Sequence, residues 1–99
     1  MPNIFIIDII YTKPLAEIDL HVAEHRAYLD KFYTSKHLIF SGRKNPPSGG
    51  IVVGMFADIN EAEKFVAGDP FKIKNLADYK ITEFNPVKYN QQVKDILGF

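Results

Sequence analysis

The sequence predicts an α+β domain with four strands in one antiparallel sheet and two main helices. Three observations predict it. Apolar runs typical of buried strands alternate with two segments whose apolar residues recur at helical spacing. These segments follow the order β-α-β-β-α-β, with a short helical segment at the end. The chain has 99 residues, 46% of them hydrophobic, which suits a single domain over 1–99 with a genuine core.

The first strand and the first helix are predicted in the N-terminal third. Residues 3–11 are almost continuously apolar and rich in isoleucine, as in a strand buried on both faces. Pro14 suits the first turn of the following helix, because its missing N–H group would have no partner there. The segment 15–35 then carries an apolar stripe at spacings of three and four. The members of this stripe are Leu15, Ile18, Val22, Leu29 and Phe32.

The remaining elements complete the sheet and its second helix. The predicted segments are strands at 38–42, 51–56 and 79–87, a helix at 60–68 and a C-terminal helix within 89–99. A loop rich in proline and glycine, 43–50, joins the second and third strands. Asn60 and Glu63 form a predicted capping box at the start of the second helix. Gly68 is predicted to end this helix in the left-handed conformation.

Right-handed connections turn this order of elements into the ferredoxin-like arrangement, with both helices on one face of the sheet. The strands at 3–11 and 51–56, however, are apolar on both faces, and only one face has helices to cover it. An uncovered apolar face most often packs against another copy of the same chain. We therefore expect a homodimer formed through the sheet.

Composition excludes several classes of function. The chain has 12 basic and 12 acidic residues and no basic cluster, so we expect no nucleic-acid partner. It has no cysteine, which removes thiol catalysis, disulfides and cysteine-based zinc sites and fits a reducing compartment. No run approaches the ~18 apolar residues of a membrane span, and the N-terminus lacks the features of a signal peptide. We expect a soluble, cytoplasmic domain with no membrane partner.

His25 interrupts the apolar stripe of the first helix at a position where leucine is expected. Burying an imidazole without a partner costs about 1–3 kcal/mol, so it needs one. Asp69 is the candidate, because it directly follows the second helix and precedes Pro70, which stiffens the turn. Together the two residues would form a catalytic base and the acid that orients it. The alternatives are a core histidine satisfied by a hydrogen bond and an ordinary Asp-Pro turn.

These motifs carry a family resemblance. The segment His-Arg-Ala-Tyr-Leu that begins at His25, then Ser41-Gly42, a Gly-Gly strand start and Asp69-Pro70-Phe71 occur in that order. With them the chain resembles the YciI-like (YCII-related) domain family over nearly its whole length. The resemblance implies a dimeric α+β barrel and a pocket that holds a His–Asp pair, usually without metal. It also implies acid–base chemistry on small carboxylated or carbonyl compounds.

Further residues are predicted to bind the substrate: Ser41, Gly42, Arg43 and Phe71. The Ser41 hydroxyl and nearby amides would contact a substrate oxygen, although a plain strand end is the alternative. Arg43 would anchor a carboxylate, because a guanidinium fork matches its two oxygens, or it is an ordinary loop arginine. His21 shares a helix face with His25, but no glutamate adjoins it as in a zinc-protease motif, and we expect no metal and no cofactor. His37 receives no role.

The sequence therefore favours a small enzyme in which His25 and Asp69 move a proton on a small organic acid or lactone. Isomerisation, dehalogenation, decarboxylation and hydrolysis all remain open. The alternative is a non-catalytic module of the same fold that binds a small ligand or a partner. A haem- or quinol-directed monooxygenase ranks last, because only an analogy of fold supports it.

Overall fold

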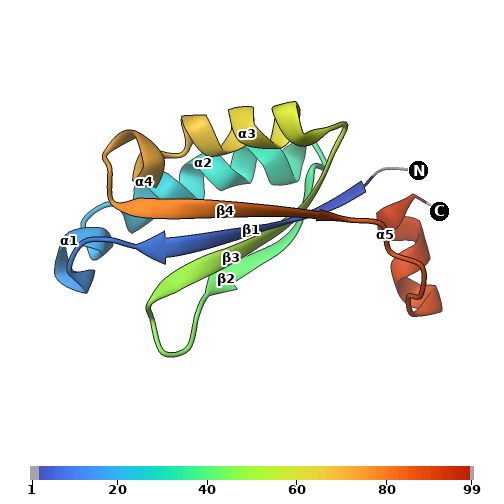
Figure 1. The fold of residues 1–99 in the computed structure, drawn as a ribbon, viewed down its shortest axis with the longest axis horizontal. Helices are drawn as coiled ribbons and strands as arrows, with labels where there is room; N and C mark the ends of the chain where they lie inside the picture. The colour runs from blue at the N-terminus through green and yellow to red at the C-terminus, as the bar shows by residue number, and fades with distance from the viewer. Residues whose placement is uncertain (1–2, 99) are drawn as a thin grey trace.

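A computed structural model describes residues 3–98 as one four-stranded antiparallel sheet with its main helices on one face (Figure 1). The strands are β1 (Asn3–Tyr11), β2 (Leu38–Arg43), β3 (Gly49–Phe56) and β4 (Ala77–Phe84). The helices are α1 (Leu15–Asp19), α2 (Val22–Thr34), α3 (Ile59–Gly68), α4 (Pro70–Ile73) and α5 (Lys94–Leu97), with a 3₁₀ turn η1 (Gln91–Val93). The strand order β2-β3-β1-β4 confirms the predicted ferredoxin-like α+β arrangement.

The register of the central strands sorts their side chains between the two faces. Phe5 lies opposite Gly54 and Ile7 lies opposite Val52, and these residues face the helices because side chains alternate along a strand. They belong to the core between the sheet and the helices. Its other buried members include Ile18, Leu29, Leu38, Phe56, Phe65 and Phe71.

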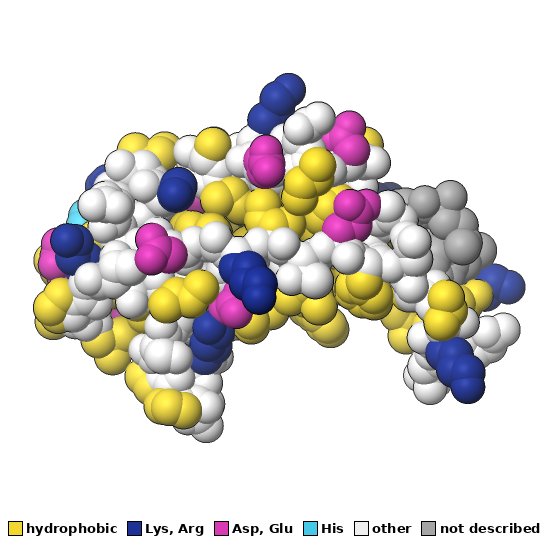
Figure 2. All heavy atoms as spheres, viewed as in Figure 1, with side chains coloured by type: hydrophobic (Ala, Val, Ile, Leu, Met, Phe, Trp, Pro, Cys, Tyr) yellow, Lys and Arg dark blue, Asp and Glu magenta, His cyan; other side chains and the backbone are white. Residues whose placement is uncertain are grey.

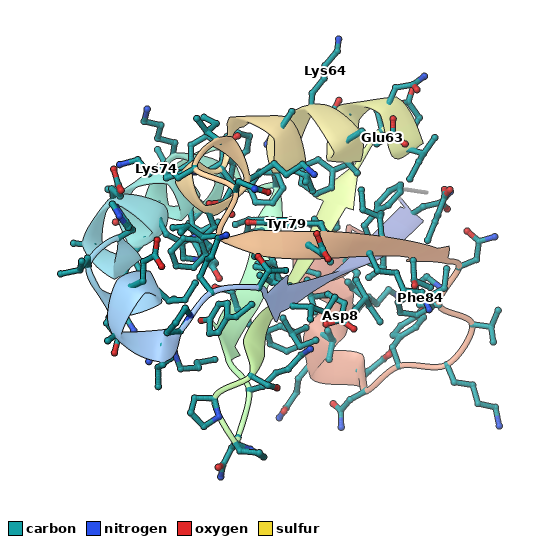
Figure 3. All side chains as sticks on the ribbon, turned by 60° about the vertical axis from the view of Figure 1, so that its left-hand side comes forward. Asp8, Glu63, Lys64, Lys74, Tyr79 and Phe84 are labelled. Carbon is teal, nitrogen blue, oxygen red and sulfur yellow. The ribbon has the colours of Figure 1, made fainter. Side chains whose placement is uncertain are left out.

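The opposite face of the sheet carries no main helix and is largely apolar. Ile6 lies there opposite Val53, and Ile10 is 39% exposed. In Figure 2 apolar side chains gather along this underside, in the hollow between the hairpin of β2 and β3 and the C-terminal helix. Asp8 lies on this face as well (Figure 3), and its Oδ1 forms an ion pair with Lys44 Nζ at 2.6 Å. The face matches the apolar surface on which the predicted dimer depends.

The predicted helix over 15–35 is wrong in one respect, because the chain forms two helices that meet at Leu20 and His21. At the junction the amide of Leu20 bonds the carbonyl of Glu17 and the amide of His21 bonds that of Ile18, a tighter spacing than in an α-helix. Ile18 is fully buried while Leu20 is 78% exposed. The change of direction lets the inner faces of α1 and α2 both reach the core.

Both predicted ends of the second helix also need correction. The N-cap of α3 is Asp58, whose carboxylate accepts the amide of Glu61 at 2.9 Å, so the capping box at Asn60 is wrong. Aspartate caps a helix as well as asparagine does, and the helix begins earlier. Gly68 is its last helical residue and is not left-handed. The helix ends because Asp69 precedes Pro70, which disfavours the helical conformation at the residue before it.

The strands β3 and β4 differ from their predicted bounds by a few residues. β3 begins at Gly49, where a Cβ atom would lie 1.8 Å from the carbonyl oxygen of Ile9, so this close pairing requires glycine. β4 ends at Phe84, which pairs with Ile4 near the first residue of β1. The predicted C-terminal helix is a short 3₁₀ turn followed by the single turn of α5. None of the helices within residues 3–98 is long and apolar enough to cross a membrane.

Candidate active site

His25 and Asp69 meet in the interior, although 44 positions separate them in the chain. His25 lies in the body of α2, and Asp69 lies at the junction of α3 and α4. Their contact joins Nδ1 of the imidazole to Oδ1 of the carboxylate at 2.8 Å. Only 12% of the His25 side chain and 1% of the Asp69 side chain are exposed. The predicted contact between the two residues is confirmed.

The Asp-Pro turn explains why this carboxylate points inward. Asp69 is the N-cap of α4, and its Oδ1 accepts the amide of Phe71 at 3.0 Å. Pro70 occupies the first helical position, where its fixed backbone suits the start of a helix. The turn that ends α3 therefore also begins α4. Asp69 is a turn residue and the partner of His25 at the same time.

A third donor reaches Asp69 from the sheet. The hydroxyl of Tyr79 on β4 donates to Oδ2 at 2.7 Å. Burial and the negative charge of Asp69 raise the pKa of Tyr79, so its hydroxyl keeps its proton and can donate. Sequence analysis missed Tyr79. The available signal was its place in the alternation of β4, where it faces the helices opposite Ile9.

These contacts fix which nitrogen of His25 carries the proton in the neutral ring. Asp69 accepts from a backbone amide and a hydroxyl, the pattern of a carboxylate, which has no proton to donate. Nδ1 of His25 must then be the donor of its own bond. The other ring nitrogen, Nε2, keeps its lone pair and has no hydrogen-bond partner within residues 3–98.

Phe71 holds the plane of the imidazole. The two rings are stacked, with centroids 4.1 Å apart and an angle of 2° between their planes. Phe71 is itself buried, and Tyr11 packs against it edge to face at 5.9 Å. One hydrogen bond and one stacked ring thus leave the His25 side chain little freedom to turn.

A cavity of about 160 Å³ lies beside His25, between α2 and the strands β2 and β3. Its wall includes every predicted substrate-binding residue: Ser41, Gly42, Arg43 and Phe71. Apolar side chains such as Val22, Leu29 and Val52 complete it. In another protein, an apolar cavity of about 150 Å³ holds one benzene molecule. This cavity therefore has room for a single ring or an aliphatic acid of similar size.

Two of the wall residues already have protein partners. The Ser41 hydroxyl lies 2.6 Å from the hydroxyl of Tyr33. The guanidinium of Arg43 donates to Oδ1 of Asp19 at 2.7 Å and to the hydroxyl of Tyr11 at 3.3 Å. The bond to Asp19, and then the bond to Tyr11, raise the pKa of Arg43. Arg43 thus ties α1 to β2, and Asp19 balances its charge.

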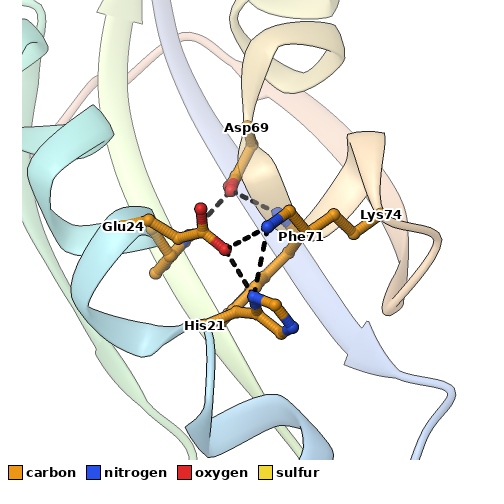
Figure 4. A network of polar contacts seen from close by, with 6 residues as sticks. His21, Glu24, Asp69, Phe71 and Lys74 are labelled. Carbon is orange, nitrogen blue, oxygen red and sulfur yellow. Dashed lines mark hydrogen bonds and ion pairs between the residues drawn. The ribbon is translucent and has the colours of Figure 1, made fainter.

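The other two histidines lie outside the cavity wall. The side chain of His21 contacts Glu24, which also accepts from Lys74 Nζ at 2.7 Å (Figure 4). His37 lies between the hydroxyl of Ser35, 2.6 Å from its Nδ1, and the carboxylate of Glu61, 3.1 Å from its Nε2. In the part of the chain that the structure describes, no group of three or more acidic or histidine side chains is placed to hold a metal ion.

The strand order and the buried pair define a ferredoxin-like α+β domain with a histidine–aspartate pair beside a small cavity. The chain belongs to the family of the YCII-related domain, whose model matches residues 4–85.

Among solved structures, the chain is similar to 5-chloro-2-hydroxyhydroquinone dehydrochlorinase from Burkholderia phenoliruptrix AC1100 in complex with 2,5-dihydroxybenzoquinone. The match has a TM-score of 0.72 and 17% sequence identity, and it covers 83% of this chain and 93% of the other. At this identity the likeness shows a shared fold. No curated protein matches the chain.

Proposed function

We propose that this protein is a small enzyme in which His25, oriented by Asp69, moves a proton on a small organic acid or lactone. One observation carries the proposal: Nδ1 is bound by a buried carboxylate while Nε2 is free and the ring lines a cavity. A positioned general base contributes about 10²–10⁴-fold to a rate. The carboxylate fixes the tautomer and stabilises the imidazolium that forms. The proposed chemistry uses no cofactor.

Proton abstraction next to an electron-withdrawing group is the step that this arrangement suits best. Nε2 would take a proton from carbon, and the electron pair left behind would form a double bond as a leaving group departs or as an enolate forms. The neighbour of similar fold is named a dehydrochlorinase, and its bound ligand is a single hydroxylated ring. The cavity beside His25 has room for such a ring. Both points support a lyase-type reaction.

The wall residues take supporting roles in the proposal. Ser41 and the backbone at Gly42 would contact a substrate oxygen, and Arg43 would close the wall between α1 and β2. Phe71 would support the imidazole and one side of the substrate. In this proposal the protein acts as a homodimer through the face of the sheet opposite the main helices. Light scattering should then give twice the chain mass of 11.3 kDa, and a monomer would contradict the dimer.

Deuterium exchange tests the proposal without knowledge of the product. The protein is incubated in D₂O with a panel of small keto acids, hydroxylated ring acids and lactones, and NMR follows the loss of the proton on the activated carbon. At least one compound should exchange faster with the wild type, and His25→Ala and Asp69→Asn should each remove ~10²–10⁴-fold of that rate. The double variant should be little slower than either single variant, because the two residues act as one unit.

His21→Ala is the matched control, since it removes a histidine from the same helical region outside the cavity wall. Its exchange rate should match that of the wild type. If His21→Ala and His25→Ala reduce exchange equally, or if the losses at His25 and Asp69 simply add, the catalytic pair is wrong. Compounds that bind at His25 without any exchange would support the non-catalytic binding module instead.

A further inference from the structure

The cavity wall contains two arginines that differ in how they are paired. Arg43 is bound by Asp19 and Tyr11, as described above. Arg26, the residue after His25 on α2, lines the same cavity. Its side chain makes no hydrogen bond, ion pair or ring contact with the rest of residues 3–98. A guanidinium with free donors at the edge of a small cavity is available to a ligand.

The charged side chains in the cavity wall are all basic, and this makes the free guanidinium of Arg26 a candidate anion-binding group. The residues that line the cavity include these two arginines and no aspartate or glutamate. Asp19 balances Arg43 from outside the wall, and Asp69 lies behind the rings of His25 and Phe71. Of the two arginines in the cavity wall, Arg26 is therefore the one that forms no ion pair with an acid within residues 3–98. Such a charge beside low-dielectric walls attracts an anion.

We propose that the ligand of this cavity is a small organic monoanion whose carboxylate pairs with Arg26. The apolar body of the ligand, a single ring or a short branched chain, would pack against Val22, Leu29 and Val52. Arg26 and His25 are consecutive in α2, so the same helix turn anchors the ligand and presents Nε2 to it. This inference rests on the proposed function for the site and names its substrate class.

Arg26 suits the role of carboxylate anchor, predicted from the sequence for Arg43, better than Arg43 does. Arg43 is held by two partners and cannot offer its full fork to a carboxylate without losing the bond to Asp19. Arg26 has five donors and no partner to give up. A bidentate carboxylate bond to Arg26 therefore replaces only water, and charge-assisted bonds of this kind are about twice as strong as neutral ones.

Benzoate and benzamide provide the test, because they have nearly the same shape and only benzoate is charged. Binding is followed by two-dimensional ¹H–¹⁵N NMR, which also shows that each variant is folded. The wild type should bind benzoate at least ~10-fold more tightly than benzamide, with shifts around the cavity. Arg26→Gln should remove this preference and Arg26→Lys should keep part of it. Lys31→Gln, which removes an exposed cation of the same helix outside the cavity wall, should leave the preference within about twofold.

The inference is overturned if benzoate is not preferred, if the preference survives in Arg26→Gln, or if Lys31→Gln removes it as well. The comparison of benzoate with benzamide measures binding alone and does not require the protein to be an enzyme. If no compound of the panel exchanges its proton but the benzoate preference depends on Arg26, the proposed function fails while the ligand class stands. If exchange occurs only with uncharged lactones and benzoate does not bind, the proposed function stands while the inference about Arg26 fails.

Discussion

Two histidine–acid contacts lie about one helical turn apart at the start of α2, and both involve the segment that contains α4. The inner contact joins His25 to Asp69, with 12% and 1% of the two side chains exposed. The outer contact joins His21 to Glu24, with 27% and 41% exposed, and Lys74 completes it from the end of α4 (Figure 4). A histidine thus contacts a carboxylate once in a buried environment and once in a solvent-exposed one.

The comparison shows that surroundings, and not the residue pair, decide what a histidine can do. In the outer contact Lys74 and His21 share one oxygen of Glu24, and solvent screens their charges. In the inner contact the carboxylate is out of water, holds three donors and leaves Nε2 free beside a cavity. Removing a member of the inner contact should therefore lower the free energy of unfolding strongly. Removing a member of the outer contact should lower it only slightly.

Asp69→Ala should have the largest effect on stability. It leaves the Nδ1–H of His25, the amide of Phe71 and the hydroxyl of Tyr79 without their acceptor, at about 1–3 kcal/mol for each unsatisfied group. We expect a loss on the order of 3–5 kcal/mol in the free energy of unfolding, measured with urea. Asp58→Ala is the control, because Asp58 is also an N-cap but holds only one amide, and it should cost about 1 kcal/mol. Equal losses would mean that Asp69 is merely a cap.

Tyr79→Phe should cost less, about 1.5–3 kcal/mol, because it removes one bond to a charged group and keeps the ring. The pH dependence has a definite sign. The folded-state pKa of Tyr79 is raised above its ordinary value of 10.0, so its contribution is complete below that pH and is lost as the pH rises above it. The difference in stability between wild type and Tyr79→Phe should therefore shrink in strong alkali. A difference that grows there would contradict the bond to Asp69.

Gly68→Ala tests the close approach of α3 to α2 beside the inner contact. Alanine normally favours a helix over glycine by about 1 kcal/mol. Here a Cβ atom would lie 2.4 Å from the hydroxyl oxygen of Tyr28, which is held by its bond to the Phe65 carbonyl at 2.7 Å. We expect a net loss on the order of 1–2 kcal/mol. In a Tyr28→Phe background the same substitution should cost clearly less, and an equal cost in both backgrounds would exclude this clash.

Glu24→Gln should lower the stability of the fold least. Its difference from the wild type should disappear in acid. The hydrogen bond from Lys74, followed by that from His21, lowers the pKa of Glu24 below its ordinary value of 4.5. The stabilisation is therefore present above that value and is lost as the pH falls through the lower folded-state pKa. Thermal unfolding at neutral pH and low salt should show a slightly lower midpoint for Glu24→Gln. High salt should erase the difference, and a salt-independent loss as large as that of Asp69→Ala would break the comparison.

The sequence predicted the inner pair better than it predicted the elements that hold it. The interruption of the apolar stripe at His25 pointed to a partner, and Asp69 was identified because Pro70 marks a stiff turn. The break at Leu20 could not be predicted, because Leu15, Ile18 and Val22 keep a helical spacing across it.

Tyr79 and Arg26 were missed for a different reason. The alternation of β4 indicates that Tyr79 faces the helices, but no local pattern gives the register of β4 against β1 that brings its hydroxyl to Asp69. Arg26 resembles any surface arginine in the sequence. It differs from Arg43 only because Asp19 binds the latter, and that contact joins residues 24 positions apart.

The tautomer of His25 tests the central claim most directly. ¹⁵N NMR of the imidazole nitrogens distinguishes a proton on Nδ1 from one on Nε2, in spectra recorded where the nitrogen shifts themselves show a neutral ring. The wild type should show His25 protonated on Nδ1, with Nε2 carrying the lone pair, and Asp69→Asn should disturb this preference while Glu24→Gln leaves it unchanged. A proton on Nε2 in the wild type, or a tautomer that is indifferent to Asp69, would contradict the account.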